Sequence, residues 1–391
     1  MKTLTNLQAR QFILLKQGLL GEHQFAGKQG ALEYIRRAGC IQFDPVDLCG
    51  KNAELTLQSR VKGFKKPMLH DLLYRDRLLF DYPDKQLSII PIEYWAHFSH
   101  LRDIAKANLD KHPEIAAHIP PVRAHIEENG AVCSDDFALE GSTNWWSAIN
   151  WSAGGKLSRS VLEQMYASGD LIVHHKKGTR RYYDIAQRHI PAHILHGDNP
   201  LVDEFSRLKW QVLRRIGAVG LLWNRASDAF IGIGGLSVEA RNQAVAALLA
   251  EGEIIETAVK GMKDKFYFCA GDAPLFERVT AEDACRPRME FIAPLDPFMW
   301  DRRLIKAIFG FEYTWEIYTT PHKRKYGVYV LPMLYGNGFV GRVEAVCDRK
   351  AGTLAVKNIW CEDGVRETKK LAAAVDRRLE KFAAFNDAVR V

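Results

Sequence analysis

"LSRSVLEQMYASGDLIVHHKKGTRRYYDI", residues 157–185, gives the clearest indication of the fold, because its pattern recurs over residues 236–270. Each copy opens with Leu-Ser and continues with aliphatic residues at helical spacing. Each then reaches a glycine followed by an acidic residue and two aliphatics, a basic turn with a second glycine, and an aromatic strand. A helix followed by a two-stranded hairpin with a basic tip is the second half of a winged helix. The sequence therefore predicts a repeated winged-helix unit.

The two copies share their predicted boundaries. Ser158 and Ser237 suit helix N-caps, and Gly169 and Gly252 suit helix ends. Short helices are predicted before each long helix, over residues 132–139 and 221–233. The long helix of such a unit can enter a major groove of DNA, and the hairpin tip can contact phosphates. Winged helices also serve as protein–protein modules, so the repeats alone leave both functions open.

The flanking regions complete the predicted architecture. Amphipathic helices over residues 6–20 and 30–40 are consistent with a third winged helix. Beyond residue 285, aromatic and β-branched residues predict a sheet with a terminal helix lying on it. Its strands are expected at 311–320, 326–335, 339–348 and 353–362, and its helix from residue 366. The predicted domains are winged helices at 1–110, 120–190 and 200–272, and a β-rich region at 285–391. The fold class is therefore α+β.

Length and composition indicate a globular, intracellular protein. The 391 residues favour two to four domains, and 47% apolar and 26% charged residues are ordinary globular values. The sequence contains no run of 18 apolar residues, and its N-terminus lacks the apolar core of a signal peptide. The seven cysteines form no C-x-x-C pair, which argues against a zinc ribbon and suits a reducing cytoplasm.

The net charge of +7 permits binding to nucleic acid, and the basic residues are clustered. Three clusters, at residues 59–66, 174–181 and 322–325, each lie beside a turn signal. Any one of them could be a solvated loop, but together they favour a surface that binds a polyanion. The residues predicted to contact phosphates are Arg60, Lys62, Lys65, Lys66, Lys176, Lys177, Arg180, Arg181, Arg302, Arg303, His322, Lys323, Arg324 and Lys325.

Several common kinds of catalytic site have no sequence signature in this chain. The phosphate-binding loop G-x-x-x-x-G-K-[ST], the zinc motif H-E-x-x-H and the nucleophile elbow G-x-S-x-G do not occur. His174 and His175 are adjacent in a predicted strand and would face opposite ways, which favours a hairpin over a metal site. Trp145, Trp146 and Trp151 could stack on bases, although core packing is the more common role of such a cluster.

The element Gln42-Phe43-Asp44, which follows the second predicted helix, places two polar side chains among apolar residues. In a strand, Gln42 and Asp44 would share one face, and Pro45 would end the regular ladder. The element would thus present an amide and a carboxylate side by side on a stiff backbone.

The loop "PLDPFMWDRR", residues 294–303, is the second unusual element. It combines Asp296, Asp301, Arg302 and Arg303 with two prolines and a tryptophan. Two interpretations remain open. The loop is either a structural linker with internal ion pairs or a rigid arm that carries two arginines to phosphates.

The Gln-apolar-Asp element and the run from 294 to 345 resemble the YcaQ/AlkZ-type winged-helix DNA glycosylases. The resemblance spans most of the chain and implies three tandem winged helices around a concave channel, with a β-rich C-terminal part. It implies a monomeric, monofunctional enzyme of the bacterial cytoplasm that acts at the nucleoid. The implied reaction is hydrolytic removal of N7-alkylated purines from double-stranded DNA, including unhooking of interstrand crosslinks, without metal or cofactor.

The resemblance assigns catalysis to Gln42 and Asp44. The Gln-apolar-Asp branch is associated with broad substrate tolerance. The aromatic-His-Glu segment of that branch has no direct counterpart here, and "EYWAH", residues 93–97, is the nearest similar stretch. The competing hypothesis is a DNA-binding regulator without catalytic activity, which explains the repeats and basic tips equally well.

Overall fold

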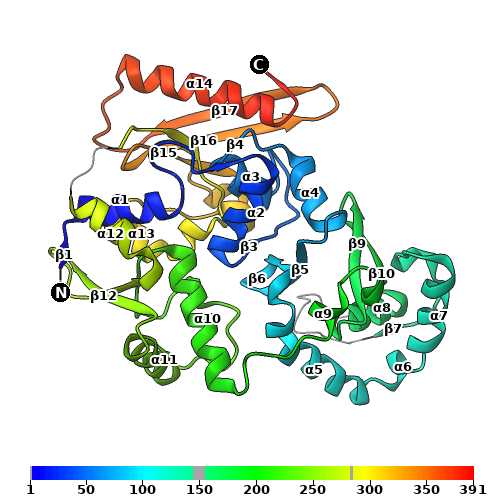
Figure 1. Cartoon of the computed structure of the whole chain (residues 1–391). Helices are drawn as coiled ribbons and strands as arrows, with labels where there is room; N and C mark the ends of the chain where they lie inside the picture. Colours follow the sequence, from blue (N-terminus) through cyan, green and yellow to red (C-terminus); the bar gives the residue numbers. More distant parts are fainter. Residues whose placement is uncertain (1, 144–154, 282–284) are drawn as a thin grey trace. The chain divides into compact units, whose positions relative to one another are not determined.

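The computed structural model describes residues 2–143, 155–281 and 285–391 and has an α+β fold (Figure 1). The chain forms two compact units. Unit 1 comprises Met1–Leu69 and Leu208–Val391, and unit 2 comprises His70–Arg207. In the part of the chain that the structure describes, no helix is long and apolar enough to span a membrane. The predicted division into three winged helices stays a prediction.

The N-terminal part of unit 1 confirms both predicted helices. Thr5 caps the first helix with a capping box, and Gly39, at φ 75°, ends the second. The helices are α1 (Asn6–Lys16), α2 (Gly27–Ala38) and α3 (Asn52–Gln58), and α4 (Lys66–Tyr74) runs across the boundary at Leu69. The short strands are β1 (Thr3–Leu4), β2 (Phe25–Ala26), β3 (Ile41–Gln42) and β4 (Val61–Lys62), with β2 and β4 paired in parallel.

The second copy of the repeat, also in unit 1, folds as expected. Ser237 caps α11 by accepting a hydrogen bond from the Ala240 N–H at 3.0 Å. The helices are α10 (Glu204–Val219), α11 (Val238–Ala250) and α12 (Ala273–Thr280). The strands are β11 (Leu222–Trp223), β12 (Ile254–Val259) and β13 (Lys265–Cys269), which form one sheet with β1 in the order β1-β12-β13-β11. The short helix predicted over 221–233 is wrong. Its start joins the sheet as β11, and only Asp228–Phe230 forms a 3₁₀ turn.

The C-terminal part of unit 1 is a five-stranded sheet covered by the terminal helix (Figure 1). Fully buried Leu331, Val343 and Leu354 of the sheet pack with Leu379 and Phe382 of the helix. The strands are β14 (Met289–Phe291), β15 (Val330–Tyr335), β16 (Gly338–Asp348), β17 (Thr353–Cys361) and β18 (Val389–Arg390). The helices are α13 (Arg302–Phe309) and α14 (Lys369–Phe385).

The predicted strand over residues 311–320 is wrong. This stretch is irregular and contains one 3₁₀ turn, Glu316–Tyr318. The buried Glu316 carboxylate accepts backbone N–H bonds from Lys325, Tyr326 and Gly327 at 2.8–3.1 Å. A side chain that bonds to the backbone in this way takes the place of a ladder partner.

Unit 2 contains the first copy of the repeat. Its helices are α5 (Ser99–Asn108), α6 (Pro113–Ala116), α7 (Ile119–Asn129), α8 (Leu157–Ala167) and α9 (Ala192–Leu195). Its strands are β5 (Leu79–Asp84), β6 (Gln86–Pro91), β7 (Ser142–Thr143), β8 (Gly155–Lys156), β9 (Leu171–Lys177) and β10 (Arg180–Ile185). Antiparallel pairs form between β5 and β6, β7 and β8, and β9 and β10. The predicted helix and hairpin are therefore confirmed as α8, β9 and β10.

Two details of the first copy differ from the prediction. Ser158 is not the cap of α8, because the helix already begins at Leu157, directly after β8, and Ser158 is buried in its first turn. The helix predicted over 132–139 is a single 3₁₀ turn at Ser134–Asp136. Val132 instead forms an isolated bridge with Tyr183 of β10, which fixes the chain in an extended form there.

Candidate active site

The Gln-Phe-Asp element begins where α2 ends. Gly39 has a positive φ of 75°, and a Cβ there would lie 3.1 Å from Arg214 Nε. Arg214 Nη2 donates to the Gly39 carbonyl at 2.7 Å, so the turn packs closely against this side chain. Glycine is the residue that fits both the φ value and the close approach. The chain then enters β3, which ends at Gln42.

Gln42 is 7% exposed and held through its backbone. Its main-chain carbonyl accepts a hydrogen bond from Asn52 Nδ2 at 2.9 Å. The side-chain oxygen, Oε1, is buried and has no hydrogen-bond partner among the described residues. A buried acceptor without a partner is costly, so its presence in a folded protein calls for an explanation, and function is a frequent one.

Asp44 lies two residues further on, in irregular backbone and half-buried. One carboxylate oxygen, Oδ1, accepts the Val46 N–H at 2.9 Å, which makes a tight local turn around Pro45. Desolvation by burial raises the pKa of Asp44, and the Val46 hydrogen bond offsets part of that effect. The carboxylate is therefore less well stabilised than one on an open surface.

Asn52, the first residue of α3, joins the two unusual sequence elements. It donates to the carbonyl of Gln42, and its own Oδ1 accepts the Leu295 N–H at 2.9 Å. Asn52 is 1% exposed, so both bonds are shielded from water. The sequence prediction missed this residue, because its only signal was a polar residue at the start of an unassigned helix.

The predicted contact between Arg60 and phosphate is wrong, because Arg60 is buried. Its side chain is fully buried and forms a two-pronged ion pair with Asp296, with N–O distances of 2.6 and 2.8 Å. The same guanidinium donates to Thr56 O at 2.9 Å and to Ser59 Oγ at 2.7 Å. A side chain so enclosed fixes the 294–303 loop against α3 and does not reach DNA.

The 294–303 loop is held by its two aspartates. Asp301 accepts the indole N–H of Trp223 at 2.7 Å and caps α13 through the Leu304 N–H. Arg302 lies half-buried over the Tyr313 ring, 5.4 Å from its centroid. Arg303 is exposed and donates to the Ala226 carbonyl. The expected ion pairs within the loop are therefore wrong, because Asp296 pairs with Arg60 outside it, and phosphate binding by the two arginines stays a prediction.

The other basic residues predicted in unit 1 lie at its surface. Lys66 is half-buried, donates to Asn386 Oδ1 at 2.9 Å and contacts the Phe385 ring. Arg324 is half-buried and donates to the Thr319 carbonyl at 2.8 Å. The exposed members are Lys62, Lys65, His322, Lys323 and Lys325.

The hairpin of unit 2 places its four predicted cations in different environments. Lys176 is nearly buried and paired with Asp81 at 2.7 Å, so its charge is neutralised locally. Arg180 is exposed and pairs with Asp135 at 2.7 Å, and Arg181 is half-buried. Lys177 is exposed beside the Tyr182 ring. Lys177 and Arg180 are the exposed cations at the tip, and their contact with phosphate stays a prediction.

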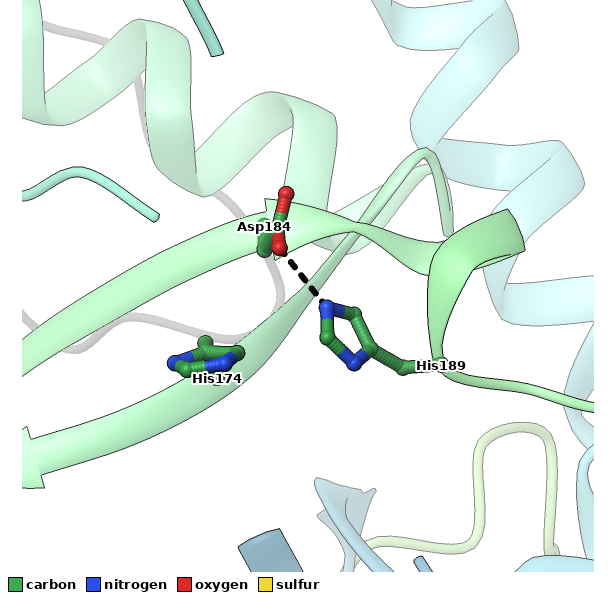
Figure 2. A group of neighbouring side chains, drawn as sticks. All are labelled: His174, Asp184 and His189. Carbon is green, nitrogen blue, oxygen red and sulfur yellow. Dashed lines mark hydrogen bonds and ion pairs between the residues drawn. The ribbon is translucent and has the colours of Figure 1, made fainter. Parts of the chain in front are cut away.

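The base of this hairpin gathers His174, Asp184 and His189 (Figure 2). Their ligand atoms all lie within 4.8 Å of one another, so the three side chains are close enough to be considered as a metal site. His189 Nε2 lies 2.7 Å from Asp184 Oδ2, and Arg188 and the Ile185 N–H bond to Oδ1. These contacts lower the pKa of Asp184 although burial opposes them.

Two features favour a hydrogen-bonded brace over a metal centre at this cluster. His174 Nδ1 lies 2.8 Å from His175 Nδ1, so the expectation that the two rings face opposite ways is wrong. The positive charges of Arg77 and Arg188 oppose the binding of a cation here.

Two further sequence observations are left without a role at this site. Trp145, Trp146 and Trp151 lie outside the described residues. His97 lies in the 3₁₀ turn Ala96–Phe98, where its ring packs edge-on against Tyr94 at 5.2 Å between centroids.

Comparison with known proteins defines the class of this enzyme. The family model of AlkZ-like DNA glycosylases matches residues 35–385, which include the Gln-Phe-Asp element and the 294–303 loop. The chain therefore belongs to the DNA glycosylase AlkZ-like family: it is a DNA glycosylase of DNA repair, and DNA is its partner. Among solved structures, it is similar to Streptomyces sahachiroi DNA glycosylase AlkZ, with 14% identity and a TM-score of 0.64. The match covers 100% of this chain and 99% of that one, and it shows a shared fold.

Proposed function

We propose that the protein hydrolyses the N-glycosidic bond of N7-alkylated purines in double-stranded DNA, including interstrand crosslinks, and that Gln42 and Asp44 carry the reaction. The observation that carries this proposal is the buried, unpartnered Oε1 of Gln42, two residues from a carboxylate whose pKa is raised by desolvation. Both groups are poorly satisfied by the protein itself. The amide of Gln42 is suited to hold a water molecule, and the carboxylate of Asp44 is suited to stabilise a developing positive charge.

The chemistry of the lesion explains why an amide and a carboxylate suffice. An N7-alkylguanine already carries positive charge, so the bond between C1′ and N9 breaks with its electron pair moving to the base. The sugar then becomes oxocarbenium-like, and the Asp44 carboxylate stabilises that charge. Gln42 Oε1 accepts a hydrogen bond from the attacking water, whose oxygen bonds to C1′. Asp44 accepts the proton that the water loses. The products are the free base and an abasic sugar, so the enzyme is monofunctional.

A crosslinked base suits an open site. Its tether to the opposite strand prevents the full rotation into a deep pocket that most glycosylases use. The catalytic pair, with Gln42 at the end of β3 and Asp44 in the turn that follows, would act without that rotation. We also propose that the protein works as a monomer, with the exposed basic residues contacting phosphates on either side of the lesion.

The test is release of free base. Incubation of the protein with a duplex that contains N7-methylguanine is expected to yield free N7-methylguanine and an abasic site, without strand cleavage. A duplex that carries an interstrand crosslink through N7 of guanine should be separated into two strands. Tight DNA binding without any released base would instead support a regulator without catalytic activity.

A further inference from the structure

A groove of about 1020 Å³ crosses unit 1 beside the terminal helix. Its walls are α14, the end of α3 with the segment that follows it to Pro67, and residues 286–290 before and within β14. The proposed reaction at Gln42 and Asp44 uses none of the residues that line it.

The groove is strongly basic. Among the described residues that line it, nine are lysine or arginine and three are aspartate or glutamate. The cations are Lys62, Lys65, Lys66, Arg286, Arg288, Lys370, Arg377, Arg378 and Lys381. The acids are Glu22, Glu290 and Asp387. Cations gathered in this way repel one another, and a low-dielectric wall focuses their field into the groove.

The buried charged side chains of the groove already pair with one another, and their positive charges outnumber the negative one. The buried Glu290 carboxylate forms ion pairs with Arg288 at 2.8 Å and with Arg378 at 2.9 Å. One carboxylate therefore serves two guanidinium groups. Burial lowers the pKa of the nearby His23, and the Arg288 charge lowers it further, as expected where the field is positive.

The rim carries the cations that face solvent. Lys370, Arg377 and Lys381 are exposed on α14, at intervals of seven and four residues, which places them along one face of the helix. Lys62 and Lys65 are exposed on the segment between α3 and α4, which also lines the groove. Five exposed cations on two separate segments that line one groove match a polymer with repeated negative charges better than one small anion.

We propose that this groove binds the phosphate backbone of the substrate duplex near the lesion. The proposal rests on the proposed function. Helix α3 sets the distance: Asn52 at its start holds Gln42, and Gln58 at its end lines the groove. At ~1.5 Å rise per residue the two ends lie about 9 Å apart. One short helix therefore connects the catalytic pair to the groove.

The test reverses the charge on one wall. The variant carries Lys370→Glu, Arg377→Glu and Lys381→Glu, which leaves the buried Arg288–Glu290–Arg378 group intact. The control carries Lys350→Glu, Lys357→Glu and Lys369→Glu, which are exposed residues of the same region outside the groove. Both variants change the net charge by the same amount, so a general loss of basicity affects them equally. Circular dichroism and thermal unfolding verify that each is folded.

Duplex affinity is measured by fluorescence anisotropy at several salt concentrations. If the groove variant loses two or three phosphate contacts, its slope of log K against log salt should fall by about two to three, since each contact accounts for ~0.9. We expect at least about a tenfold loss of affinity near 0.1 M salt and less than about a twofold loss for the control. Equal effects in the two variants would overturn the proposal. The same anisotropy measurement is made with RNA and with heparin. A loss of affinity for these polyanions without a loss for the duplex would also overturn the proposal.

Base release separates this proposal from the proposed function. At saturating protein, the groove variant should release N7-methylguanine at the wild-type single-turnover rate, because its catalytic pair is unchanged. If neither protein releases base but the groove variant still loses duplex affinity, the groove proposal holds and the proposed function fails. If both release base and bind equally well, the groove proposal fails alone.

Discussion

Asp44 in unit 1 and Asp184 in unit 2 are partly or fully buried carboxylates with opposite electrostatic surroundings. Asp184 accepts hydrogen bonds from Arg188 and the Ile185 N–H and contacts the ring of His189, and these contacts lower its pKa. Asp44 accepts a hydrogen bond from the Val46 N–H, and burial raises the pKa of Asp44. The fully bonded carboxylate stabilises a hairpin. We propose that the poorly compensated one interacts with the substrate, because perturbed groups often mark functional sites.

Asp44→Asn should give the largest effect on activity. The amide keeps the shape and can still accept the Val46 N–H, but it no longer opposes the oxocarbenium charge or accepts a proton. We expect base release to slow by about two to four orders of magnitude. Single-turnover release of N7-methylguanine measures the rate. Duplex affinity serves as the control and should not fall, because a like charge near phosphate has been removed.

Gln42→Ala should give a smaller loss of activity, of roughly one to two orders of magnitude, because the water loses a positioning group while the carboxylate remains. Gln42→Asn provides a matched variant that keeps the amide but shortens its reach. If the alanine variant keeps the full rate, the unpartnered Oε1 has no part in the reaction.

Asp184→Asn tests the other side of the comparison. It removes the charge that holds Arg188 and His189, so we expect a loss of unfolding free energy of about 1.5–3 kcal/mol. The single-turnover rate at saturating protein should stay within about twofold of wild type. Urea unfolding followed by tryptophan fluorescence measures the first effect. Unchanged stability would show that the hydrogen bonds at the hairpin base are dispensable.

The pH dependence of stability should differ in sign between the two variants, and this is the smallest expected effect. A lowered pKa means that Asp184 stabilises the fold above its unfolded pKa, and this stabilisation is lost as pH falls through the folded pKa. A raised pKa means that ionised Asp44 destabilises the fold as pH rises. Asp184→Asn should therefore lower the melting temperature near neutral pH and lose this effect in acid. Asp44→Asn should leave the neutral melting temperature equal or higher.

The sequence predicted what local patterns determine. The apolar stripe and the glycine of each repeat were enough for α8, α11 and their hairpins, because these features act within a few residues. The two polar side chains among apolar residues identified the Gln-Phe-Asp element, and the family resemblance assigned catalysis to it, which stays a prediction. The predicted elements were wrong where contacts with residues further along the chain determine the local structure. Residues 311–320 have strand-like composition, but Glu316 bonds to the backbone ten residues away instead.

Arg60 shows the same limit for the site. In the sequence it belongs to a basic cluster, and only the fold brings it to Asp296, 236 residues away. The roles of Asn52 and of the α14 cations likewise depend on contacts between segments that are distant in sequence. Composition identified the basic surface but not which of its members are already neutralised inside the protein.

The most direct test of the central claim is single-turnover release of N7-methylguanine by wild type, Asp44→Asn and Asp184→Asn, side by side at saturating protein. We expect Asp184→Asn to match wild type and Asp44→Asn to be slower by at least about a hundredfold. Equal rates for wild type and Asp44→Asn, with equal DNA occupancy, would contradict it. The Asp44 carboxylate would then only shape the turn around Pro45.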